Sequence, residues 1–277
     1  MNKLTSYLEL TRPLNNLITA LAVFTGAWIA GLTGSLSNLF FSLLSASFIS
    51  AGGYVINDYF DLETDKINKP SKPLPQVKIK TRSALAFSFI LFLIGLFLSF
   101  FIKGVAFVIA ITVAVLLILY SFRFKRTPLF GNLLVSFICG LAFIYGGLVG
   151  RDFRLSFIPA GFAFLFHLGR EIIKDIEDLK GDISSGAQTL PVVSGVNISL
   201  LLITIVFSGL IFLTIVPYYL RIFPVLYLII VSVIDFLLVY VMVSMWRDQS
   251  KENLGMLSGI LKLGMILGLV AIFLVRF

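Results

Sequence analysis

Apolar segments long enough to cross a lipid bilayer recur along nearly the whole chain, and they limit what it can fold into more than any other feature. Each segment must be helical, because lipid cannot satisfy an open backbone and the residues do not alternate as barrel strands would. The predicted fold class is therefore an all-α integral membrane protein. We expect nine spans, at 14–33, 36–57, 83–102, 104–121, 130–149, 155–174, 194–216, 222–245 and 254–275.

The low share of charged residues excludes most soluble functions. Charged residues make up 13% of the chain, whereas a soluble domain carries about 25%, so no room remains for a large soluble domain. The formal net charge of +8 could suggest nucleic acid, but no soluble basic domain is present to bind it. We therefore predict no nucleic-acid partner and assign the charge to retention of Lys and Arg on the cytoplasmic side.

The distribution of Lys and Arg predicts the orientation in the membrane. Residues 1–13, the connections after spans 2, 4, 6 and 8 and the adjoining helix ends carry sixteen of these residues, against five on the opposite side. Lys262 lies inside the ninth span. This asymmetry predicts a multi-pass protein of the cell membrane with a cytoplasmic N-terminus and cytoplasmic connections after spans 2 and 6.

Two acidic clusters occupy those two connections and are related to each other. Besides the aspartates, which repeat at a spacing of 117 residues, the dipeptide Leu74-Pro75 recurs as Leu190-Pro191, one residue short of that spacing. We therefore interpret residues 1–277 as a single domain with a possible internal repeat of a four-helix unit, roughly 14–121 and 130–245. The aspartates of the first cluster return 117 residues later in the second: Asp58, Asp61 and Asp65, then Asp175, Asp178 and Asp182.

The spacing of these aspartates suggests a metal and diphosphate site. Residues at i, i+3 and i+7 share one face of an α-helix, and three stacked carboxylates repel each other unless a cation lies among them. Hard oxygen ligands of this kind favour Mg²⁺, which is usually completed by substrate phosphates. Two such faces could hold a diphosphate and stabilise it as a leaving group. We therefore predict all six aspartates to be metal-binding and catalytic residues.

The two clusters also carry a family resemblance. Residues 57–65, from Asn57 to Asp65, match the NDxxDxxxD motif of the UbiA superfamily of intramembrane prenyltransferases, and residues 175–182 resemble its second motif, DxxDxxxD. The resemblance implies nine helices bundled around a central cavity, with cytoplasmic cap connections after helices 2 and 6. It also implies Mg²⁺-dependent transfer of a prenyl group from a prenyl diphosphate donor.

Two further stretches, 65–75 and 169–178, resemble the archaeal-type geranylgeranylglyceryl phosphate geranylgeranyltransferases of that superfamily, although Lys69 and Lys72 stand where Arg is typical. This implies a geranylgeranyl diphosphate donor and a lipid-phosphate acceptor, whose free hydroxyl forms the second ether bond of archaeal-type lipids. The alternative is an aromatic acceptor, as in quinone, haem or chlorophyll-type synthesis. A divalent-cation transporter is disfavoured, because the acidic residues gather at one membrane face rather than the midplane.

Other residues are candidates for substrate contact, each with a structural alternative. Arg12 and Asn15 resemble the first-helix signature of the superfamily, but could instead anchor a helix end. His167 could act as a base or simply pack, while Asp235 and Lys262 should face the protein interior or pair with each other. The predicted substrate-binding residues are Asn57, Arg12, Asn15, Lys66, Tyr120, Lys125, Arg170 and Lys174.

Overall fold

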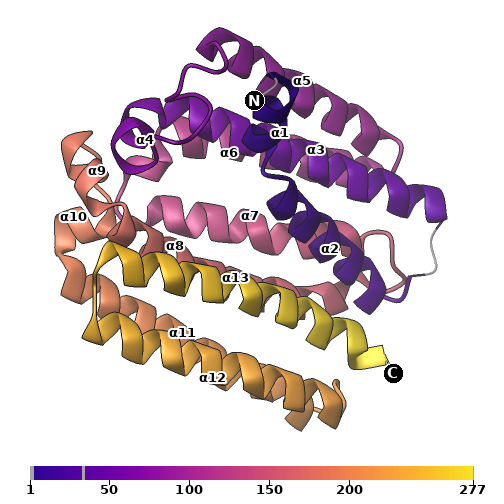
Figure 1. The fold of residues 1–277 in the computed structure, drawn as a ribbon. Helices are drawn as coiled ribbons and strands as arrows, with labels where there is room; N and C mark the ends of the chain where they lie inside the picture. Colours follow the sequence, from indigo (N-terminus) through magenta and orange to yellow (C-terminus); the bar gives the residue numbers. More distant parts are fainter. Residues whose placement is uncertain (1–2, 33–34, 277) are drawn as a thin grey trace.

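The computed structural model describes residues 3–32 and 35–276, and within them every regular element is a helix (Figure 1). One isolated antiparallel bridge joins Leu32 to Gly150. The α-helices are α1 (Lys3–Thr11), α2 (Pro13–Ile29), α3 (Leu36–Phe60), α4 (Leu62–Asn68), α5 (Thr81–Phe100), α6 (Gly104–Phe122), α7 (Phe130–Gly147), α8 (Phe157–Glu177), α9 (Leu179–Ser184), α10 (Leu190–Ser194), α11 (Val196–Tyr219), α12 (Val225–Arg247) and α13 (Lys251–Phe273). Three 3₁₀ turns complete them: η1 (Phe124–Arg126), η2 (Phe153–Ser156) and η3 (Leu274–Arg276).

The long helices make this a multi-pass membrane protein. Seven of the described helices, α3, α5, α6, α7, α11, α12 and α13, are long and apolar enough to cross a bilayer. The apolar α2 has 17 residues, and α8 has 21 but carries charged residues in its last turns. The break expected at Lys103-Gly104 is confirmed, because α5 ends at Phe100 and α6 begins at Gly104.

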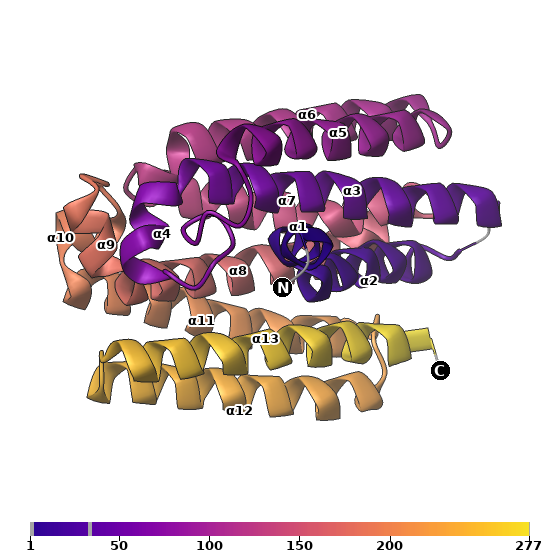
Figure 2. The ribbon, with the colours of Figure 1, turned by 45° about the horizontal axis from the view of Figure 1, so that its top comes forward.

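The helices pack as two groups joined along α2, α7 and α8 (Figures 1 and 2). One apolar core lies among α8, α11, α12 and α13, and a second lies among α2, α3, α6 and α7. At the crossing of α2 and α7, a Cβ on Gly146 would lie 2.7 Å from the carbonyl carbon of Val23. Only glycine permits this close backbone approach.

Short helices gather at one end of the bundle. There α4, which follows α3, packs against α9, which follows α8, and both views place them together with α10 (Figures 1 and 2). The two acidic segments, 117 residues apart in sequence, are thereby brought to the same end of the molecule.

Candidate active site

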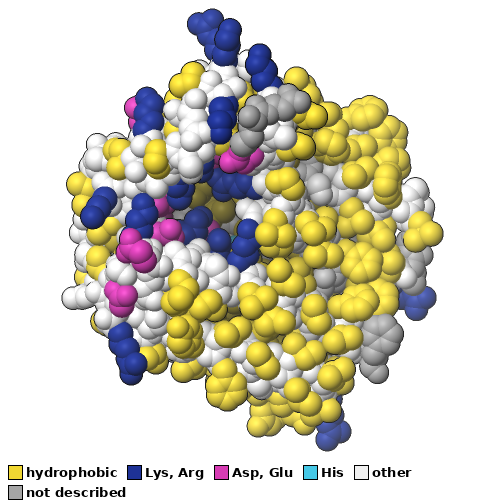
Figure 3. Space-filling view, in the orientation of Figure 1, with side chains coloured by type: hydrophobic (Ala, Val, Ile, Leu, Met, Phe, Trp, Pro, Cys, Tyr) yellow, Lys and Arg dark blue, Asp and Glu magenta, His cyan; other side chains and the backbone are white. Residues whose placement is uncertain are grey.

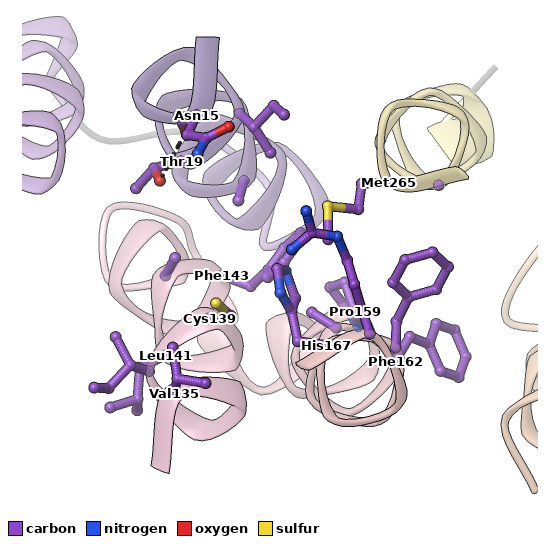
Figure 4. Close-up of a pocket in the computed structure, with 18 of the residues that line it drawn as sticks. Asn15, Thr19, Val135, Cys139, Leu141, Phe143, Pro159, Phe162, His167 and Met265 are labelled. Carbon is purple, nitrogen blue, oxygen red and sulfur yellow. Dashed lines mark hydrogen bonds between the residues drawn. The ribbon is translucent and has the colours of Figure 1, made fainter. Parts of the chain in front are cut away.

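A charged mouth opens over a cavity inside the bundle. In Figure 3, basic and acidic side chains surround a hollow near α4 and α9, whereas much of the rest of this face is hydrophobic. The cavity has a volume of about 360 Å³ and is lined from both helix groups, including α2, α3, α7, α8, α12 and α13. In Figure 4, Asn15 and Thr19 of α2, Cys139 of α7, His167 of α8 and Met265 of α13 surround it.

Each acidic motif breaks its helix at the middle aspartate. Asp61 ends α3 and precedes α4 with φ −83° and ψ 0°, while Asp178 ends α8 and precedes α9 with φ −90° and ψ 3°. The expectation of one continuous helix face is therefore wrong, because both residues occupy the sparsely populated bridge region rather than the α region. The break turns the last aspartate of each motif, Asp65 or Asp182, onto the short helix of the cap.

Cations hold the outer aspartates of the first motif. Asp58 accepts hydrogen bonds from Arg12 at 2.5 Å and from Lys72 at 2.9 Å, and Lys72 also donates to Asp65 at 2.6 Å. Both carboxylates are buried. Burial raises the pKa of Asp65 despite the charge of Lys72. Lys72 therefore bridges two acids that would otherwise repel each other.

The middle aspartate of the first motif faces the cavity residue Lys125. The two form an ion pair, and the side-chain amide of Asn57 donates to the same carboxylate oxygen, Oδ2 of Asp61, at 2.6 Å. Burial opposes ionisation of Asp61, but the nearby cations Lys125, Lys72 and Arg12 together outweigh it and lower the pKa of that carboxyl. Burial likewise opposes the charge on Lys125, and the acids Asp61, Asp65 and Asp178 together outweigh it and raise the pKa of the ammonium. This pair stays charged.

The second motif is held mainly by neutral donors. Asp175 accepts from Asn132 at 2.8 Å, and Asp182 accepts from Thr189 at 3.0 Å. Burial raises the pKa of Asp182. The sequence analysis missed Asn132, although a signal was present: it lies 117 residues after Asn15, the same separation that relates the aspartates.

Side chains from the first motif segment reach the second motif directly. Lys69 donates to the carboxylate of Asp178 at 2.8 Å, and the amide of Asn68 donates to its backbone carbonyl at 3.2 Å. Asn68 also lies against Gly181, where a Cβ would contact its side-chain carbon at 2.6 Å. The two halves of the chain therefore build one mouth.

The donor set fits a hard divalent cation. Within residues 3–32 and 35–276, no three or more His, Cys, Asp or Glu side chains already lie close enough to hold a metal, since Lys, Arg, Asn and Thr occupy most of the carboxylates. One buried carboxylate oxygen, Oδ1 of Asp178, has no hydrogen-bond partner. Clustered carboxylates of this kind are the ligands that Mg²⁺ prefers.

Arg12 is held in a strained conformation at the top of the cavity. It lies in the left-handed region, with φ 52° and ψ 68°, immediately before Pro13 at the start of α2, and its guanidinium lies 4.9 Å from the ring centroid of Tyr54. Burial opposes the charge on Arg12, but Asp58, Tyr54 and Asp61 together outweigh it and raise the pKa of Arg12. Such strain persists only where surrounding contacts fix it, as at many functional sites. Leu129, 117 residues later, also has positive φ, 61°, before α7.

The remaining candidates divide between the cavity and the surface. Asn15 and Tyr120 line the cavity. Lys66 instead pairs with Glu63 at 2.7 Å on the exposed side of α4. No ion pair joins Asp235 to Lys262 in the described residues, although both line the cavity.

Two predicted cations are held within the cavity by one glutamate. Lys174 donates to Glu171 at 2.8 Å and 2.9 Å, and Arg170 donates to it at 3.3 Å. All three side chains line the cavity. The Nε atom of Arg170 is buried and has no partner.

Fold and site together define a polytopic membrane protein whose charged mouth and apolar interior suit an amphipathic phosphate substrate. The chain belongs to the UbiA prenyltransferase family, whose model matches residues 17–274. It is thus a membrane-bound prenyltransferase.

Named relatives match along nearly the whole chain. Digeranylgeranylglyceryl phosphate synthase of Methanosphaera stadtmanae is 40% identical over 266 residues, which cover 96% of this chain and 97% of that protein. The enzyme of the same name from Methanocaldococcus jannaschii is 38% identical over 284 residues, covering 98% and 96%.

Solved structures share the fold. One, from work on digeranylgeranylglyceryl phosphate synthase in membranes, is 36% identical, with a TM-score of 0.76 over 99% of both chains. A UbiA homologue from Archaeoglobus fulgidus, solved bound to GPP and Mg²⁺, has a TM-score of 0.65 at 20% identity, covering 96% of this chain and 99% of that one. At that identity the likeness establishes the fold alone.

Proposed function

We propose that this chain transfers a geranylgeranyl group from geranylgeranyl diphosphate to the free hydroxyl of geranylgeranylglyceryl phosphate, in a Mg²⁺-dependent reaction. This proposal is carried by one observation: the two acidic motifs meet at one end of the bundle, beside a cavity that is lined by Lys125, the partner of Asp61, and by Arg170 and Lys174. Carboxylates suit a metal–diphosphate complex, while cations inside the cavity suit an acceptor that carries a phosphate. The named relatives support the same substrates.

The chain's own residues would hold and neutralise the diphosphate. The six aspartates would supply oxygen ligands to Mg²⁺, which when bound would neutralise the leaving pyrophosphate. Lys125, and Lys72 once released from its acids, would donate to the phosphate oxygens. The carbon–oxygen bond of the donor breaks, the acceptor hydroxyl oxygen bonds to the allylic carbon, and the hydroxyl proton is released.

The apolar interior would protect the allylic cation from water. Below the charged mouth, the cavity is lined mainly by hydrophobic side chains, including Phe162, Phe166 and Leu238. Such a lining excludes water and accommodates a prenyl chain. Tyr54 and Tyr120 face the same space and provide electron-rich rings near the site of ionisation.

The topology belongs to the same proposal. We place α2, α3, α5, α6, α7, α8, α11, α12 and α13 across the membrane as nine spans around a central cavity, with the N-terminus, α4 and α9 on the cytoplasmic side. Sixteen Lys and Arg residues at that end support the orientation. The internal repeat within one domain is supported by the shared break at Asp61 and Asp178 and by the positive φ of Arg12 and Leu129.

The purified protein tests the function directly. Labelled geranylgeranyl diphosphate and Mg²⁺ are incubated with geranylgeranylglyceryl phosphate or with an aromatic acceptor, and products are separated by chromatography. We expect ether product with the glycerophosphate and none after chelation of Mg²⁺. Product with the aromatic acceptor alone would overturn the proposed acceptor while keeping the donor.

A further inference from the structure

Lys262 is a cation in the middle of a membrane-spanning helix, and no carboxylate of the described residues pairs with it. It lies in α13, lines the cavity, and makes no ion pair with any described residue. A charged side chain inside a membrane helix is costly and usually serves a function. The acid of the adjacent helix α12 is Asp235, and its carboxylate accepts a hydrogen bond from Thr214 at 3.2 Å rather than one from Lys262.

The packing of α13 against α8 places Lys262 level with Arg170. A Cβ on Gly255 would lie 3.5 Å from Oε1 of Glu177, and one on Gly264 would lie 3.2 Å from the ring of Phe166. The two helices are therefore antiparallel and in register at these points. Lys262 is seven residues beyond Gly255, and Arg170 is seven residues before Glu177, so both lie about 10 Å below the level of Glu177 at 1.5 Å per residue.

The electrostatic surroundings at this depth favour an anion. Among the described residues, five Lys and Arg side chains line the cavity, including Lys262 and Arg170, against two acids, Glu171 and Asp235. Glu171 is shared between Lys174 and Arg170 and leaves the buried Nε of Arg170 without a partner. Like charges directed into one low-dielectric cavity repel each other unless an anion lies between them.

We propose, on the basis of the proposed function, that Arg170 and Lys262 bind the phosphate of the acceptor lipid. In that lipid the nucleophilic oxygen is on the carbon next to the one that bears the phosphate. The allylic carbon under attack and the acceptor phosphorus are thus joined by five bonds, which span at most about 7 Å at about 1.5 Å per bond. This length fits a phosphate held at the depth of Arg170 and Lys262 below a diphosphate at the mouth, and an uncharged aromatic acceptor has no anionic group to place there.

The bound phosphate fixes which oxygen reacts. With the diphosphate held at the mouth and the acceptor phosphate held by Arg170 and Lys262, the intervening hydroxyl is brought to the allylic carbon. Holding the reactants in this way lowers the barrier by removing the entropy of alignment. Lys262 is therefore a specificity residue for phosphate-bearing acceptors.

The test compares the wild type with Lys262→Gln, Lys262→Arg and a matched control, Lys80→Gln, an exposed lysine at the cap end. Removing a charge from a membrane helix favours insertion, so the glutamine variant should fold. We expect the KM for geranylgeranylglyceryl phosphate to rise about tenfold or more in Lys262→Gln. The donor KM should change less than twofold, Lys262→Arg should restore most of the loss, and Lys80→Gln should match the wild type.

Two further measurements separate the phosphate site from the proposed function. Geranylgeranylglycerol, which lacks the phosphate, should react equally with wild type and Lys262→Gln, and equal losses with both acceptors would overturn the proposal. Binding of geranylgeranylglyceryl phosphate without donor or Mg²⁺, with competition by inorganic phosphate, reports the site without catalysis. If the wild type binds geranylgeranylglyceryl phosphate tightly, Lys262→Gln binds it weakly and neither forms ether, the proposed transferase function is rejected and the phosphate site is kept. If instead Lys262→Gln forms ether with an unchanged KM for the acceptor, the phosphate site is rejected and the proposed transferase function is kept.

Discussion

Replacing Lys72 with Met tests whether cations and Mg²⁺ compete for the same carboxylates. Lys72 joins Asp58 and Asp65, and its side chain is 19% exposed against 6% for Asp65. Asp58 keeps Arg12, but Asp65 loses its only ion-pair partner within residues 3–32 and 35–276. Removing one partner from a buried pair costs about 3–5 kcal/mol, and the partial exposure of Lys72 places the cost near 3 kcal/mol. That corresponds to a fall in Tm of about 5–10 °C.

The assay is thermal unfolding of the purified protein with and without Mg²⁺, beside the exposed control Lys80→Met. Because Mg²⁺ brings positive charge to the same carboxylates, it should restore at least half of the Tm lost in Lys72→Met. The wild type should gain less, since Lys72 already neutralises its acids. Equal Tm values and equal Mg²⁺ responses in Lys72→Met and Lys80→Met would refute the reasoning.

Three other substitutions test separate parts of the structure. Asp178→Ala should reduce geranylgeranyl transfer to background with nearly normal expression, because it removes a carboxylate with a free buried oxygen; near wild-type turnover would contradict the metal site. Asn132→Ala should lower kcat about tenfold to a hundredfold by releasing Asp175, with Tm changed by only a few degrees. Gly146→Ala should destabilise the α2–α7 crossing by about 1–3 kcal/mol in thermal unfolding, whereas Gly209→Ala, which meets open space, should be neutral or stabilising.

The sequence predicted the helices and the pairing of the motifs for physical reasons. Apolar length alone distinguishes a membrane helix from other elements, and the helix break at Lys103-Gly104 followed from the thickness of the bilayer. The acidic motifs lie at one end because each follows a span that runs in the same direction. Family membership, and with it the prenyltransferase activity, was indicated by the two motifs and is confirmed by the family match.

The partners of each acid could not be predicted from the sequence. Spacing on an ideal helix gives no sign of the break at Asp61 and Asp178, because that break depends on cap residues packing from elsewhere. Lys66 was the lysine of this segment predicted to contact substrate, yet it faces outward, whereas Lys72 joins two acids. Lys262 looked like a residue in need of a partner acid, and only the register of α13 against α8 shows that the cation Arg170 lies at its level.

The contacts of Lys69 and Asn68 with Asp178 have a consequence for how such a chain can be divided. Each half of the polypeptide contributes one acidic motif, and the first half supplies two side chains that hold Asp178 of the second motif. Separately expressed fragments would each contain an incomplete mouth and would have to assemble to act. A half-length chain could build this site only by pairing with a second copy of itself, so covalent linkage of the halves guarantees a one-to-one partnership and allows each copy to specialise. The two halves already differ in their basic residues: Lys69 and Lys72 lie in the first half, and the positions 117 residues later are occupied by Gly186 and Thr189.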